Sequence, residues 1–151
     1  MKKMIAGFVG VLALSGFGLA NAAGDVVEKH SKMVKDADWN AMQTVTIKLT
    51  EFSYEGPLTF ESGKTYKLEL KNVGEKKHYF TAPEFFKQVA TRKAQVNDQA
   101  EIKADHFNAF EILPGGQLDF YFVADTKGEF PVYCTIDDHR DEGMDEVIVV
   151  K

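Results

Sequence analysis

Hydrophobic and polar residues alternate with a period of two along most of the chain after residue 43. Val45, Ile47 and Leu49 alternate with polar residues, which predicts a strand with one buried face. The same spacing, or a short apolar run, predicts further strands over residues 58–60, 66–70, 107–113, 118–123, 130–134 and 147–151. Glycine and proline separate these segments, as in Gly56-Pro57 and Pro114-Gly115-Gly116, and favour turns. Roughly seven short strands with such turns and no internal repeat predict an all-β protein, a Greek-key β-sandwich.

Two segments depart from this pattern. Residues 83–105 begin with apolar residues at helical spacing and continue with a charged stretch, so we expect a short inserted helix and loop over one end of the sheet. Residues 23–42 are polar, and Asp25 with Glu28 forms a capping box, which favours a short helix or a loosely held arm. The sandwich domain is therefore expected over residues 43–151.

The first 22 residues have the order of a secretory signal peptide. Met1-Lys2-Lys3 precedes an apolar stretch from Met4 to Leu19, and Ala20-Asn21-Ala22 offers a small-residue cleavage site, as in exported proteins. A transmembrane anchor is the alternative, but glycines interrupt the run and it is short for a span of ~20 residues. We expect cleavage after Ala22 and a periplasmic protein with no membrane span.

The charge balance bears on possible partners. Without Lys2 and Lys3, the 18 basic and 23 acidic residues of the whole chain become 16 and 23, a formal net charge of −7. Nucleic acid and anionic membrane surfaces are not expected to bind such a protein, whereas a protein partner with a basic docking surface is. The alternative is that the acidity only keeps the protein soluble.

Cys134 is the single cysteine of the chain, so no intramolecular disulfide can form. In an exported protein such a thiol is a buried inert side chain, an intermolecular disulfide or a metal-bound thiolate. Its surroundings favour the last, because His139 and Met144 follow at equal spacing in one loop between two predicted strands. Thiolate, imidazole and thioether are the soft ligands of a blue-copper site, which also needs a second imidazole. His78 follows a strand and a loop and is the best candidate, with His106 as its competitor.

Four segments of the sequence resemble the cupredoxin family, which includes plastocyanin, azurin, pseudoazurin and auracyanin. They are Asn72-Val73-Gly74 followed by His78, Leu113-Pro114-Gly115, Gly128 to Cys134, and the ligand loop that ends in Gly143-Met144. The resemblance covers roughly residues 45–151, and the loop spacing is most similar to that of auracyanin. It implies that one copper ion is held in a type 1 site by His78, Cys134, His139 and Met144. It also implies a one-electron carrier whose electron leaves through the exposed edge of His139.

Other copper and zinc sites fit the sequence less well. A binuclear centre needs two bridging thiolates, multicopper oxidases place His on both sides of the Cys, and structural zinc sites use Cys and His rather than Met. Tyr133 and Thr135 flank Cys134 here. No Ser-His-Asp order or carboxylate pair stands out as a catalytic motif, so an enzyme is not expected. His30 and Met33 could contact copper from the N-terminal arm, but ordinary surface or packing roles are favoured.

The chain departs from plastocyanin and azurin near the predicted site. Those proteins have an Asn next to the upstream His, whereas Lys77 and Tyr79 flank His78, which leaves Thr135 to support the ligands. The ligand loop is also acidic, with six carboxylates against Arg140: Asp137, Asp138, Asp141, Glu142, Asp145 and Glu146. These features leave open a second function, periplasmic copper handling by sequestration or delivery. A third alternative is an interaction domain with the same fold and no metal.

Overall fold

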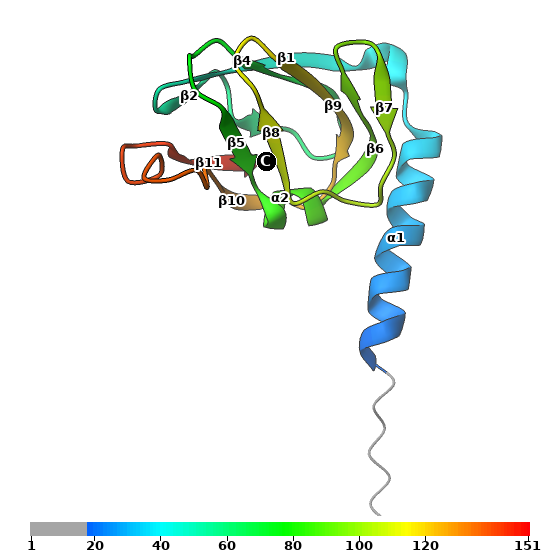
Figure 1. Ribbon diagram of the computed structural model, residues 1–151. Helices are drawn as coiled ribbons and strands as arrows, with labels where there is room; N and C mark the ends of the chain where they lie inside the picture. Colours follow the sequence, from blue (N-terminus) through cyan, green and yellow to red (C-terminus); the bar gives the residue numbers. More distant parts are fainter. Residues whose placement is uncertain (1–17) are drawn as a thin grey trace, which may run out of the picture.

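The computed structural model describes residues 18–151, which form two packed β-sheets and two α-helices (Figure 1). The first sheet has the order β2-β1-β4-β9-β6-β7, and the second β3-β11-β10-β5-β8. The first contains β1 (Gln43–Thr50), β2 (Ser53–Glu55), β4 (Thr65–Asn72), β6 (Val89–Val96), β7 (Ala100–Ile102) and β9 (Gln117–Ala124). The second contains β3 (Thr59–Phe60), β5 (His78–Thr81), β8 (Ala109–Ile112), β10 (Gly128–Tyr133) and β11 (Asp145–Val150). The predicted β-sandwich is confirmed.

On strands with one face toward solvent, the apolar residues of the alternating pattern are the buried ones. Along β4, Tyr66, Leu68 and Leu70 are buried, while the residues between them are half-buried. Ile47 and Leu49 of β1 are also fully buried. Between the sheets, phenylalanine rings pack edge-to-face and stacked, with Phe120 and Phe122 of β9 at a centroid separation of 5.0 Å. Burial of this apolar surface is the main stabilising contribution to a sandwich core.

The segment after residue 83 is only partly as predicted. The short helix α2 (Pro83–Lys87) is present, with Phe85 and Phe86 buried, but β6 and β7 replace the expected loop. β6 pairs antiparallel with β9, so its backbone groups complete that edge of the first sheet. Ala94 of β6 packs in the core between the sheets, whereas Ala90 is buried on the opposite face of the strand, and such small side chains leave only a faint alternation in the sequence.

The N-terminal arm is a helix, α1 (Gly18–Asp36), that lies beside β6 at the far side of the sandwich from the 134–144 loop (Figure 1). Asp125 holds it, since its carboxylate lies 2.6 Å from Lys29 Nζ and 3.1 Å from His30 Nε2. Within residues 18–151, neither helix has the length and apolar character that crossing a membrane requires. The predicted signal peptide, residues 1–22, lies largely outside the described residues.

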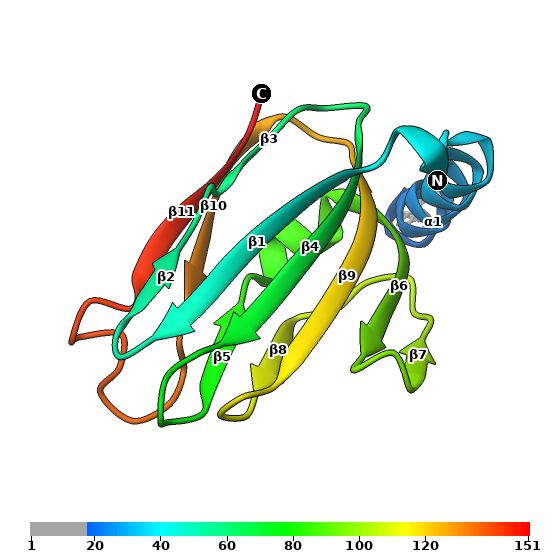
Figure 2. The same ribbon diagram turned by 90° about the horizontal axis from the view of Figure 1, so that it is seen from above.

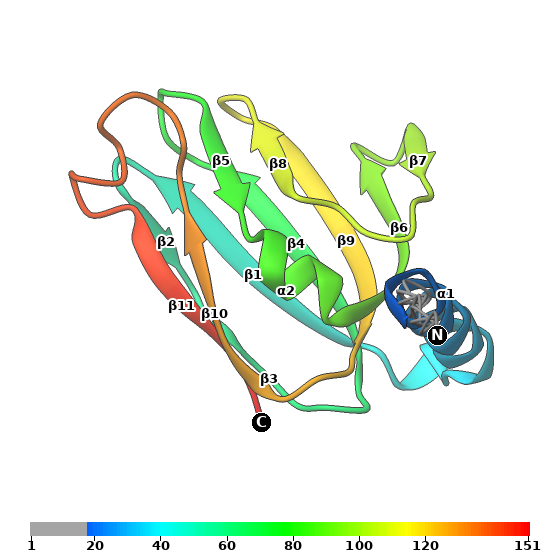
Figure 3. The ribbon, with the colours of Figure 1, turned by 90° about the horizontal axis from the view of Figure 1, so that it is seen from below.

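Several loops meet at one end of the sandwich (Figures 2 and 3). Backbone hydrogen bonds join the 73–77 loop to the end of β1 and the 113–116 turn to the end of β4: Val73 N–H donates to Leu49 O, and Gly115 N–H donates to Asn72 O, both at 3.0 Å. The 134–144 loop between β10 and β11 closes the same end. Side chains from both sheets can therefore converge there.

A charged cluster crosses three strands on the outer face of the first sheet. Glu69 of β4 lies in register with Thr46 of β1 and Asp119 of β9. Its carboxylate lies 2.8 Å from Lys71 Nζ and 3.0 Å from Lys67 Nζ. Hydrogen bonds from these two lysines lower the pKa of Glu69 from 4.5 to about 2.

A depressed folded-state pKa stabilises the fold above the unfolded-state value, and this contribution is lost as the pH falls. We expect Glu69→Gln to be less stable than the parent protein above pH 4.5, with the difference disappearing as the pH falls to about 2. Urea unfolding of the metal-free proteins across this range measures it. Glu129→Gln, an exposed change elsewhere, is the control. A difference that stays constant with pH would contradict the assignment.

Candidate metal centre

Three of the four predicted ligands lie on one loop whose ends are fixed by adjacent strands. Tyr133 and Asp145 are paired in the β10–β11 ladder, and the next bond, from Cys134 N–H to Met144 O at 3.0 Å, closes the loop. Met144 N–H in turn donates to His139 O at 3.0 Å. Cys134, His139 and Met144 are all buried. The backbone thus turns three side chains with metal-binding atoms inward at one end of the sandwich.

His78 opens β5 and is fully buried. The preceding loop is ordered by Asn72, whose Nδ2 donates to Lys76 O at 2.7 Å and to Ile112 O at 2.8 Å, while its Oδ1 accepts from Gly74 N–H. This network places His78 at the same end as the ligand loop. The Asn-x-Gly turn is therefore a structural support for the strand that carries the imidazole.

The three side chains His78, Cys134 and His139 form a compact cluster. Their ligand atoms all lie within 4.8 Å of one another, and Cys134 Sγ is 3.5 Å from His139 Nδ1. A first-row metal ion that bonds to N and S at about 2.0–2.3 Å can join these two atoms. His78 Nδ1 is buried and has no hydrogen-bond partner within residues 18–151. An unpaired buried ring nitrogen is costly, and a metal ion would satisfy it.

Burial also favours the metal-binding form of His78. Desolvation lowers the pKa of its imidazole, because the charged form loses hydration. The neutral ring offers a lone pair to a metal. Its other nitrogen, Nε2, lies 3.4 Å from Glu51 Oε1, so the carboxylate can accept a hydrogen bond from a protonated Nε2, which leaves Nδ1 with a free lone pair.

The thiol of Cys134 is supported by the backbone. Tyr79 N–H donates to Cys134 Sγ at 3.4 Å, so the residue after His78 supplies a hydrogen bond through its main chain, which does not depend on its side chain. Thr135, expected to support the ligands, is exposed. The sulfur therefore has a hydrogen-bond donor although no Asn lies beside His78.

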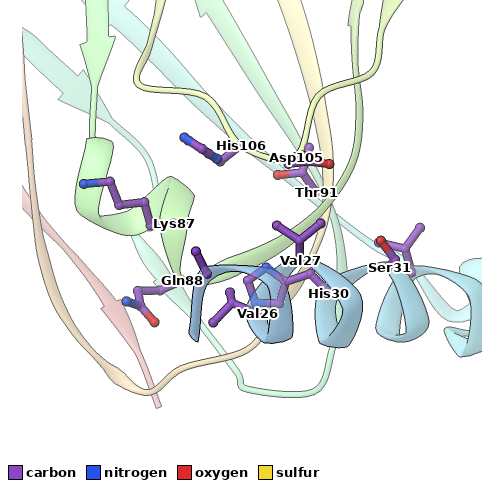
Figure 4. A pocket seen from close by; sticks show the side chains of 11 residues that line it. Val26, Val27, His30, Ser31, Lys87, Gln88, Thr91, Asp105 and His106 are labelled. Atoms are coloured by element: carbon purple, nitrogen blue, oxygen red, sulfur yellow. The ribbon is translucent and has the colours of Figure 1, made fainter. Parts of the chain in front are cut away.

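His30 and His106 lie elsewhere. Both line a groove of about 540 Å³ between α1 and the segments that contain Gln88 and Thr91 (Figure 4). Neither belongs to the cluster of His78, Cys134 and His139. The predicted choice of His78 over His106 is therefore consistent with the geometry.

The fold has relatives among solved copper proteins. The multi-copper oxidase from Pseudomonas thermotolerans has a TM-score of 0.56 and 17% identity over 77% of this chain and 31% of the oxidase. The blue copper oxidase from Nitrosomonas europaea has a TM-score of 0.55 and 13% identity, over 74% of this chain and 44% of the oxidase. Auracyanin from Roseiflexus castenholzii has a TM-score of 0.49 and 20% identity, over 72% of this chain and 96% of auracyanin. The chain has the cupredoxin fold.

At these identities the similarity establishes the fold and not the activity, and the chain spans less than half of either oxidase. No protein-family model and no curated protein sequence matches it. Within the cupredoxin fold, the buried cysteine sulfur and two imidazoles support a single copper ion, because soft sulfur with imidazole nitrogen is a donor set that copper prefers.

Two residues at the metal centre were not predicted from the sequence. Glu51 and Phe52 form the β1–β2 turn. Glu51 faces His78, and the ring of Phe52 lies 4.8 Å from that of His139, centroid to centroid. No motif in the sequence marks either residue. His139 is only 2% exposed, whereas the family resemblance implies an exposed imidazole edge.

The role of Asn72 can be tested in the metal-free protein. Asn72→Ala removes two donated hydrogen bonds and leaves the buried Ile112 carbonyl without the Asn72 donor, which should cost about 2–4 kcal/mol of unfolding free energy. Urea unfolding measures the change. Asn108→Ala, at an exposed position, is the control and should have little effect. Equal stabilities of the two variants would rule out the role of Asn72 as the support of the 73–77 loop.

Proposed function

We propose that this protein is an exported blue copper protein that carries one electron at a time, with copper bound by His78, Cys134, His139 and Met144. The observation that carries the proposal is the buried cluster of one thiol and two imidazoles, in which His78 Nδ1 has no protein partner within the described residues. Met144 is fully buried at the end of the same loop, which suits a weak axial thioether ligand.

The protein residues would keep the ligand geometry nearly constant in both oxidation states. Copper supplies the one-electron couple. The loop closure between Cys134 and Met144 holds the sulfur ligands, the Tyr79 amide stabilises negative charge on Cys134 Sγ, and burial excludes water. A preset site rearranges little when the electron arrives or leaves, and this favours fast transfer.

Copper handling is the second candidate function. Its support is the acidic ligand loop, whose six carboxylate residues are all exposed and could attract a cation or a basic copper donor. The burial of His78 and His139 favours the carrier, because a delivery protein must release its ion to an acceptor. For both candidate functions we propose that the signal peptide is cleaved after Ala22 and that the mature protein is periplasmic.

The proposed partner is a redox or copper-exchange protein with a basic docking surface. Arg140 pairs with Asp145 at 2.9 Å, so the only basic residue of the loop is offset by one of its own acids. The remaining exposed carboxylates leave the loop negative. Electrostatic complementarity of this kind mainly raises the association rate.

The spectrum of the copper-loaded mature protein tests the metal site. We expect an intense thiolate-to-copper band at ~600 nm that is abolished by Cys134→Ala. His106→Ala should retain the band, whereas His78→Ala should lose or shift it. Absence of the band in the parent protein would reject the blue copper site, and its survival in Cys134→Ala would reject the assigned thiolate.

Salt dependence tests the docking surface. Electron exchange with a basic redox protein, cytochrome c, should slow as ionic strength rises, because salt screens the attraction. Asp137→Asn combined with Asp138→Asn should reduce both the low-salt rate and its salt dependence. Glu61→Gln combined with Glu129→Gln changes exposed acids away from the ligand loop and serves as the control. A rate that does not vary with salt in the parent protein would reject the acidic docking surface.

A further inference from the structure

One two-residue turn contacts both histidines of the metal centre. Glu51 and Phe52 connect β1 to β2 at the end of the sandwich where the ligand loop lies (Figure 2). Glu51 Oε1 is 3.4 Å from His78 Nε2, and the Phe52 ring is tilted by 60° against the His139 ring at 4.8 Å. Adjacent residues of a single turn thus reach imidazoles that come from different segments of the second sheet.

Glu51 is itself held in a fixed position. Its Oε1 accepts hydrogen bonds from the backbone amides of Glu75 and Lys76, both at 2.8 Å. A Cβ at Gly74 would collide with the carboxylate, so the 73–77 loop closes around it. The oxygen that faces His78 therefore has little freedom to turn away.

Phe52 covers the other imidazole. Its side chain is half-buried against the core, and Lys76 Nζ lies over the ring, 5.1 Å from its centroid. The Phe52 carbonyl also lies 3.7 Å from the position of a Cβ at Gly143 in the ligand loop. These contacts place the ring against His139, which is 2% exposed.

We infer that the Glu51-Phe52 turn is a cover of the metal centre, in which Glu51 orients His78 and Phe52 shields His139 from small molecules in solution. The inference builds on the proposed copper site. A carboxylate that accepts from Nε2 fixes the proton there and leaves Nδ1 for a metal. An aromatic ring over the second imidazole restricts access by water and chelators. Both residues are positioning residues, since neither is a ligand of the proposed ion.

The shield is tested first in the metal-free protein. Diethyl pyrocarbonate modifies accessible imidazoles, and mass spectrometry of peptides gives the rate at His139. Phe52→Ala should raise that rate several-fold, and Phe52→Leu should raise it less. Phe107→Ala removes another half-buried ring that packs on Phe110 and controls for general loosening. An unchanged rate in Phe52→Ala, or an equal increase in Phe107→Ala, would overturn the shield.

The orienting role of Glu51 is tested by NMR of the imidazole nitrogens, again without metal. The parent protein should carry the His78 proton on Nε2, Glu51→Ala should lose this preference, and Glu51→Gln should retain it because the amide oxygen still accepts. Glu55→Ala, in the adjacent strand β2, should leave the His78 signals unchanged. The same tautomer in Glu51→Ala as in the parent would overturn the role.

Copper loading then separates the inference from the proposed function. If copper gives the blue band, removal of Cu(I) by bathocuproine disulfonate should be faster in Phe52→Ala, and Glu51→Ala should bind copper about tenfold more weakly. If the metal-free tests succeed and no blue band forms, the cover stands and the blue copper function fails. If the band forms and neither variant changes the metal-free readouts or copper release, the cover is rejected and the function stands.

Discussion

The hydrogen bond from Cys134 N–H to Met144 O is the constraint on which the metal centre depends. It extends the β10–β11 ladder by one step past Tyr133 and Asp145 and so joins the first and last ligands of the loop at the end of a rigid sheet. The residues between them must then form a closed turn, within which His139 accepts from the Met144 amide. A loop fixed in this way can hold a thiol and an imidazole 3.5 Å apart without a bound metal, because the backbone has already lost the conformational freedom that ordering the ligands would cost.

The second sheet supplies one more ligand, His78, and here the position is fixed by hydrogen bonds from the Asn72 side chain to the backbone. Asn72 occupies the end of β4 in the first sheet and donates to the Ile112 carbonyl of β8 in the second, so it links the two layers just beside His78. His78 is itself paired with Ile112 in the β5–β8 ladder. The relative position of the sheets is therefore coupled to the position of the imidazole. Because its side chain makes these hydrogen bonds, Asn72 can be only 2% exposed beside an otherwise aromatic and aliphatic core.

The sequence predicts those features that depend on local periodicity or on a single loop. Alternation along β1 and β4 and the equal spacing of Cys134, His139 and Met144 are both local, and they predict the sandwich and the ligand loop, whereas the choice of His78 rests on the family resemblance. The role of β6 was missed because alanines give a weak pattern and its pairing with β9 is a tertiary property. Glu51 and Phe52 were missed for a related reason: their contacts are with residues 27 and 87 positions later in the chain, and no local pattern encodes them.

The burial of His139 bears on the role of the acidic residues in the ligand loop. An exposed imidazole edge would let a partner approach the metal directly, and charges around it would act mainly on recognition. With Phe52 over the ring, a partner of the proposed kind would contact the aromatic side chain and the surrounding loops, while the carboxylates of residues 137–146 lie at the surface. Electrons can cross a packed aromatic ring, but a copper ion can leave only if the ring and the loop move. In the proposed function, recognition by charge and protection by burial would act on different residues, and this separation favours exchange of electrons over exchange of metal.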